Sequence, residues 1–247
     1  MLLAAVATAV SVAMLVSQLA VVGELRRRSA IAAAATTAAA AATAAGHHHH
    51  HHHHHGVPIV QSLASLLSSV LWTKYGAING DTAVVWVNSL GVAIALYILG
   101  CFWAYGGKRR RSVETSVLAT TLLAVVMVAA VDYARDPRAA DLFSLACCLM
   151  SLVFLGSPLS RIGDVVRARD ASVLLPSLAL LALVNNLLWA AYGARHHDPY
   201  MVVPNIVGAV FCSVQLALVA YYGRAAAAAA AAAGGPSPEE VKLADLS

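Results

Sequence analysis

Two asparagines lie inside strongly apolar stretches of the sequence. Asn88 lies within VVWVNSLGVAIALYILG (84–100), and Asn205 lies within MVVPNIVGAVFC (201–212). A primary amide has two donor hydrogens and one acceptor oxygen, and leaving it unpaired in apolar surroundings costs about 2–7 kcal/mol. Two amides that faced a common cavity could hold neighbouring hydroxyls from both sides of a sugar ring. Bonding between membrane helices is the alternative role for each asparagine.

A tryptophan precedes each asparagine by sixteen residues. Trp72 precedes Asn88, and Trp189 precedes Asn205. An indole face offers a flat apolar surface that suits the C–H groups of a sugar. The alternative is a belt of aromatic residues at the membrane–water interface. The equal spacing favours a shared role for the two tryptophans.

These residues belong to an internal repeat. The stretch LLSSVLWTKYGAINGDTAVVWVNSLG (66–91) aligns without a gap with LVNNLLWAAYGARHHDPYMVVPNIVG (183–208). Six identical pairs share one offset of 117 residues: Trp72–Trp189, Tyr75–Tyr192, Gly76–Gly193, Asp81–Asp198, Asn88–Asn205 and Gly91–Gly208. Upstream, SQLAVVGELR (17–26) resembles SPLSRIGDVV (157–166) at an offset of 140. The 23-residue difference is close to the length of an Ala/His-rich insertion, so that insertion adds no structural element.

The elements that carry the repeat are apolar runs long enough to cross a membrane. Hydrophobic residues make up 60% of the 247-residue chain and charged residues only 11%, against about 25% in soluble domains. Runs of about 20 apolar residues suffice for a transmembrane helix, and nothing indicates the alternation of a barrel. We therefore expect seven spans, at residues 2–24, 57–78, 82–105, 112–133, 140–162, 173–193 and 198–222.

Basic residues follow alternate spans. Twelve of the sixteen lysines and arginines follow spans 1, 3, 5 and 7, and four lie on the opposite side. The positive-inside rule then places the N-terminus outside and the C-terminus in the cytosol. Because residues 2–24 are followed by the stop-transfer sequence RRR (26–28), we expect a membrane span there and not a cleaved signal peptide.

The fold class expected is an all-α membrane protein with seven transmembrane helices. Spans 1–3 and 5–7 form two three-helix bundles, which are parallel because an even number of crossings separates equivalent spans, and span 4 is the linker helix (3+1+3). The segments expected are the first helix of repeat 1 (1–28), a low-complexity Ala/His cytosolic loop (29–56), helices 2–3 of repeat 1 (57–107), the linker helix (108–138), repeat 2 (139–224) and a disordered cytosolic tail (225–247).

Nine consecutive histidines, His47–His55, lie in the Ala/His loop. We interpret them as natural low complexity; an expression tag and a metal-binding tract are the alternatives. The four cysteines lie within expected spans without metal-ligand spacing, so they are interpreted as small buried residues. No metal and no cofactor is expected.

The pattern WxxYG…D…N…G, present twice and joined by a connecting span, resembles the SWEET sugar transporters, relatives of the wider PQ-loop group. Parallel repeats, of which SWEETs are themselves an example, place a substrate site near the bilayer midplane between the bundles. The resemblance implies that Asn88 and Asn205 line this pocket and that Trp72 and Trp189 lie beside the sugar. It also implies extracellular gate residues, which are Tyr75 and Asp198.

The resemblance further implies a hinge at the cytosolic side that uses four prolines. Pro158 matches one of them well, and Pro176 and Pro58 lie in the corresponding regions of spans 6 and 2. Span 1 has Gln18 where a proline is expected, a departure that puts the four-proline hinge in doubt.

Several polar residues keep alternative roles. Asp81 and Asp198 open spans, where capping of a helix N-terminus is the alternative. Asn185 and Asn186, which replace Ser68 and Ser69 of the first repeat, either line the pocket or bond between helices. Pro204 should loosen span 7 next to Asn205.

The expected function is facilitative, bidirectional transport of a small neutral mono- or disaccharide. No charged residue lies at a predicted midplane, and intramembrane charges usually mark ion pathways, so a uniporter is favoured. A PQ-loop amino-acid carrier of an organelle membrane and a non-transporting receptor remain alternatives. No catalytic pair indicates an enzyme, and no nucleic-acid partner is expected. We expect a multi-pass protein of the plasma membrane or an endomembrane, in contact with lipid; homo-oligomerisation is left open.

Overall fold

The computed structural model describes residues 1–27, 29–31, 34, 59–105, 110–134, 136–154, 156–169, 171 and 174–232, for residues 137, 153–154, 156–161 and 224–232 the backbone alone. All regular secondary structure in this part of the chain is α-helical. The principal helices are α1 (Leu2–Ser17), α3 (Ile59–Asn79), α4 (Thr82–Tyr105), α5 (Arg110–Ala134), α6 (Pro137–Phe154), α7 (Gly156–Ala168), α8 (Pro176–Arg195) and α9 (Pro199–Ala232).

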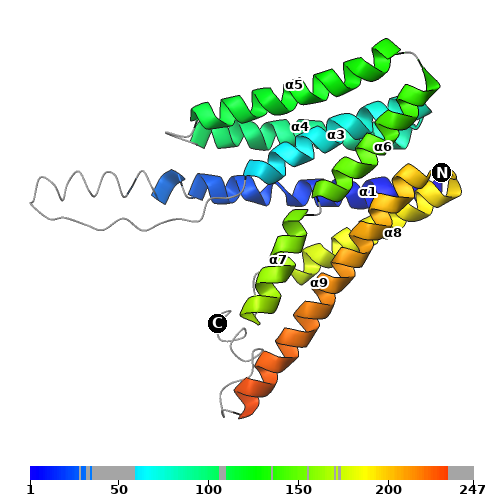
Figure 1. Cartoon of the computed structure of the whole chain (residues 1–247). Helices are drawn as coiled ribbons and strands as arrows, with labels where there is room; N and C mark the ends of the chain where they lie inside the picture. Colours follow the sequence, from blue (N-terminus) through cyan, green and yellow to red (C-terminus); the bar gives the residue numbers. More distant parts are fainter. Residues whose placement is uncertain are drawn as a thin grey trace, which may run out of the picture. The chain divides into compact units, whose positions relative to one another are not determined.

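One compact unit comprises Ser11–Cys147. Helices α3 and α4 form a hairpin across a short turn, and α5 lies along both of them (Figure 1). Two apolar clusters stabilise this unit, one built around Ile98 and Phe102 and the other around Leu66, Ala95 and Leu99. The expected linker helix therefore packs against the first repeat.

A second compact unit comprises Met1–Val10 and Cys148–Ser247. Its main feature is the hairpin of α8 and α9, and α7 contacts α9. Val165, Ala171 and Leu174 form a buried cluster that is covered by partly buried residues of α9. The second repeat thus has the same helical hairpin as the first.

Five helical segments of the described chain are long and apolar enough to cross a membrane. They are Leu2–Ile31, Thr82–Tyr105, Arg110–Ala134, Pro176–Arg195 and Pro199–Gly223. Expected spans 2 and 5, which correspond to α3 and to α6 with α7, are not among them. Helix α3 includes Gln61, four serines, Thr73 and Lys74, and these side chains lower its mean hydropathy.

Two expected spans differ from a single described helix. Expected span 5, residues 140–162, is covered by α6 and α7, and residue 155 between them lies outside the described residues. Span 1 is interrupted at Gln18 and Leu19, where the amides of both residues donate to carbonyls three residues earlier (3.2 and 2.9 Å). The chain is helical again from residue 20 to residue 27.

Helix α9 is longer than its expected span. It continues to Ala232, into the segment 225–247 that the sequence predicts as a disordered tail. The prediction is wrong for residues 225–232. These residues are all alanine, which has the highest helix propensity of any residue type. The rest of that segment and His47–His55 lie outside the described residues.

Candidate functional site

Asn88 lies on α4 and is half-buried. Its Nδ2 donates to the Val84 carbonyl one turn earlier on the same helix, at 2.9 Å. This is the only hydrogen bond of the side chain among the described residues. The second N–H and the amide oxygen therefore have no partner among the described residues.

Asn205 repeats this arrangement on α9. It is half-buried, and its Nδ2 donates to the Met201 carbonyl at 2.8 Å. Within the described residues neither asparagine bonds to a neighbouring helix, which argues against a role in holding helices together. The two asparagines belong to different compact units, so the expectation that they face one cavity stays a prediction.

Each tryptophan of the repeat packs against a tyrosine of its own helix. The rings of Trp72 and Tyr75 meet edge to face, with centroids 4.9 Å apart, and those of Trp189 and Tyr192 do so at 5.4 Å. Trp72 is half-buried, whereas Tyr75, Trp189 and Tyr192 are buried. Because an edge-to-face pair stabilises both rings, each indole is held in a fixed orientation.

The two hairpin turns have the same backbone. The Asp81 amide donates to the Gly76 carbonyl at 2.8 Å, and the Asp198 amide donates to the Gly193 carbonyl at 2.9 Å. Gly80 and the equivalent His197 both have positive φ, 68° and 55°. Glycine adopts this conformation without steric cost, whereas other residues do not. The turn of the first repeat therefore has a glycine at this position, whereas in the second repeat His197 adopts a strained backbone conformation.

Asp81 and Asp198 cap the helices that carry the asparagines. The Asp81 carboxylate accepts from the amides of Ala83 and Val84 (3.0 and 3.1 Å), and that of Asp198 accepts from Met201 (3.1 Å). These bonds match the capping alternative and fix where α4 and α9 begin. The gate role of Tyr75 and Asp198 stays a prediction.

A small residue lets the two helices of each hairpin approach closely. A Cβ at Gly91 would lie 2.6 Å from the Ser69 Oγ, and one at Gly208 would lie 2.6 Å from the Asn186 Oδ1. Asn186 donates to the Ala182 carbonyl at 2.9 Å and to the Cys212 sulfur at 3.8 Å. Asn186 therefore bonds between helices, one of its two expected alternatives. Its pairing with Gly208 was not foreseen, although both residues follow the 117-residue offset.

The expected hinge prolines are placed unequally. Pro176 is exposed and is the first residue of α8, so it starts that helix. Pro158 is the third residue of α7. Pro58 lies outside the described residues. Gln18, which replaces the fourth proline, lies at the interruption of the first helix. Pro204 is buried inside α9, one residue before Asn205.

Comparison with known proteins agrees with the family resemblance that the repeated sequence pattern indicates. Residues 48–127 and 141–227 match the family described as "Sugar efflux transporter for intercellular exchange". The sugar transporter SWEET1 of Dictyostelium discoideum is 28% identical over 66% of this chain and 76% of its own length. The bidirectional sugar transporter SWEET7 of Arabidopsis thaliana is 28% identical over 65% of each chain. The putative bidirectional sugar transporter SWEET7d of Oryza sativa subsp. japonica is also 28% identical, over 62% of its length.

The fold is shared with a solved structure. A eukaryotic SWEET transporter superposes with a TM-score of 0.66 at 21% identity, over 91% of this chain and all of that one. The superposition confirms the helical fold class, and the helices that suit a membrane indicate a multi-pass integral membrane protein. With the family match over both repeats, these findings place the chain in the SWEET family.

Proposed function

We propose that this protein is a facilitative, bidirectional sugar transporter that moves a mono- or disaccharide down its gradient by alternating access. The observation that carries the proposal is the duplicated half-site. In each repeat an amide with one N–H and its oxygen uncommitted occurs together with a tryptophan that packs against a tyrosine. The family membership and the names of the relatives support the same activity.

The proposed pocket contains Asn88, Asn205, Trp72 and Trp189. The amides bind hydroxyls as both donors and acceptors, and the indoles cover the apolar face of the ring. These groups are uncharged, so the substrate is a neutral sugar and no ion is co-transported. The seven-helix, 3+1+3 arrangement and a plasma-membrane location belong to this proposal, as does the absence of catalysis.

Tracer flux tests the proposal. Cells that lack their own hexose carriers should take up labelled glucose or sucrose when they express the protein, and uptake should survive a protonophore. Preloaded cells should release the same sugar when the gradient is reversed. Absence of flux with the protein at the cell surface would overturn the assignment, and flux abolished by the protonophore would overturn the uniport mechanism.

Replacement of the asparagines tests the site. Asn88→Ala and Asn205→Ala should each lower flux about tenfold or more, because leaving a buried hydroxyl unpaired costs about 1–3 kcal/mol. Asn79 provides a matched control, since its Nδ2 also donates to a carbonyl one turn earlier, that of Tyr75 at 2.9 Å, yet it lies at the exposed end of α3. Asn79→Ala should transport normally. Normal flux in both pocket variants would contradict the site.

A further inference from the structure

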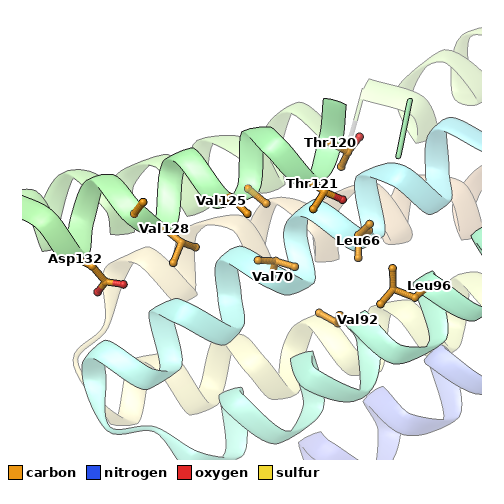
Figure 2. A pocket seen from close by; sticks show the side chains of 11 residues that line it. Leu66, Val70, Val92, Leu96, Thr120, Thr121, Val125, Val128 and Asp132 are labelled. Carbon is orange, nitrogen blue, oxygen red and sulfur yellow. The ribbon is translucent and has the colours of Figure 1, made fainter. Parts of the chain in front are cut away.

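A cavity lies within the unit Ser11–Cys147. It has a volume of about 480 Å³ and lies between α3, α4 and α5, as Figure 2 shows. Its lining is apolar except for two threonines and one aspartate: Leu66, Val70, Val92, Leu96, Thr120, Thr121, Ala124, Val125, Val128, Ala129 and Asp132. A sugar would find too few hydrogen-bond partners here, so the cavity suits an apolar ligand.

The cavity has the depth of one membrane leaflet. Its lining on α5 extends from Thr120 to Asp132, which is about 18 Å at 1.5 Å per residue. Half of the hydrocarbon core is about 15 Å thick. Since α5 ends at Ala134, the Asp132 end lies near a membrane surface and the Thr120 end near the bilayer centre. One acyl chain entering from the surrounding leaflet would fill this depth.

The polar end of the cavity has charges of both signs. Asp132 forms an ion pair with Lys74 of α3, and their side chains are 59% and 22% exposed. Figure 2 shows Asp132 at one end of the lining and Thr120 toward the other. An ammonium next to a carboxylate complements a headgroup that carries a phosphate and a quaternary or primary amine. The phosphate would meet Lys74 and the amine would meet Asp132.

Helix α5 leaves the cavity accessible from lipid. Of its 25 residues only Val113 and Ala124 are buried, and Leu118, Leu122, Leu123, Val125 and Val126 are exposed. We propose that this cavity binds one zwitterionic phospholipid of the bilayer, with an acyl chain between α3, α4 and α5 and the headgroup at Lys74 and Asp132. The bound lipid fills space between the linker helix and the first repeat.

Photolabelling of the full-length protein in lipid nanodiscs tests this site. The probe is phosphatidylcholine with a diazirine on one acyl chain, and mass spectrometry locates the label. Labelling should concentrate on residues 120–129 and on α3. Ala129→Phe fills the cavity and should lower this labelling about tenfold. Ala130→Phe is the matched control, because Ala130 is an exposed neighbour that does not line the cavity, and its labelling should equal that of the wild type.

A second pair of variants guards against misfolding. Thr121→Phe also fills the cavity, and Leu122→Phe is its exposed control. Lys74→Met should lower labelling without filling the cavity. Unlabelled phosphatidylcholine and phosphatidylethanolamine should compete at least tenfold better than phosphatidylglycerol or a sterol. Equal labelling of filled and control variants, displacement by a sterol, or a crosslink between two protein copies at this cavity would each overturn the proposal.

Discussion

At the scale of single residues, the two half-sites use the same bonds at equivalent positions. The amides of Asn88 and Asn205 each give one hydrogen to their own helix. That bond fixes the amide plane without consuming its other donor or its acceptor. A side chain oriented in this way loses little conformational entropy when a ligand binds. The repeat therefore supplies two amides that are already oriented, as the proposed sugar site requires.

Asp198 allows helix capping to be separated from gating. Asparagine caps a helix as well as aspartate does, whereas alanine does not. Asp198→Asn should therefore leave the thermal unfolding temperature unchanged, and Asp198→Ala should lower stability by about 1 kcal/mol. If the carboxylate charge closes the extracellular gate, Asp198→Asn should lower sugar flux severalfold with the helix intact. Wild-type flux in this variant would show that the residue only caps α9.

The hairpin turns give opposite expectations for two substitutions. Gly80→Ala should lower stability by about 1 kcal/mol, because a residue with a Cβ at positive φ costs about 1–2 kcal/mol. His197→Gly should raise stability by a few tenths of a kcal/mol or more, since the relieved strain exceeds the entropic cost of about 0.5–1 kcal/mol for glycine. Thermal unfolding in detergent measures both. If Gly80→Ala and His197→Gly both lowered stability by the same amount, His197 would not be strained.

Residue spacing predicted part of this detail. The 117-residue offset identified the equivalent asparagines, tryptophans and aspartates before any coordinates. The offset did not indicate that His197 has a positive φ, because histidine, unlike glycine, is not typical of that backbone conformation. Nor did it indicate that Asn186 covers Gly208. A contact between different residue types depends on helix packing, which sequence spacing alone does not specify.

At the scale of elements, the length of the apolar runs predicted where the helices lie, but it did not predict whether each helix is continuous. Residues 82–105 form one helix with the expected bounds, whereas expected span 1 is interrupted near residue 18. Hydropathy measures how much of a segment suits lipid. It does not report where backbone hydrogen bonds change partner, so this interruption could not be read from composition.

The interruption at Gln18 predicts tolerance of the proline that the family pattern would place there. The Gln18 amide donates only to a carbonyl three residues earlier, at 3.2 Å, so Gln18→Pro removes one weak bond and should cost about 1 kcal/mol. Ala13→Pro, at an exposed position inside α1, should cost about 3 kcal/mol. Thermal unfolding of both variants compares them. A larger loss for Gln18→Pro would mean that the backbone there needs its donor.

At the scale of the whole molecule, the arrangement of charge predicts the orientation in the membrane. Lysines and arginines are concentrated after alternate apolar segments, and moving such clusters across a bilayer is unfavourable. The parallel relation of the two repeats depends on the same count, because it requires α5 to cross the membrane. A linker that did not cross would make the repeats inverted.

The histidine tract offers a built-in marker for this orientation. An antibody against His47–His55 should label cells that express the protein only after permeabilisation, because the loop 29–56 is expected in the cytosol. An epitope at the C-terminus should behave in the same way, and one at the N-terminus should be accessible on intact cells. Both termini on one side would mean an even number of crossings and would contradict the 3+1+3 arrangement. Exposure of the histidines and of the C-terminus with a cytosolic N-terminus would instead reverse the orientation while keeping an odd number of crossings, so the three epitopes together distinguish an even helix count from an error in direction.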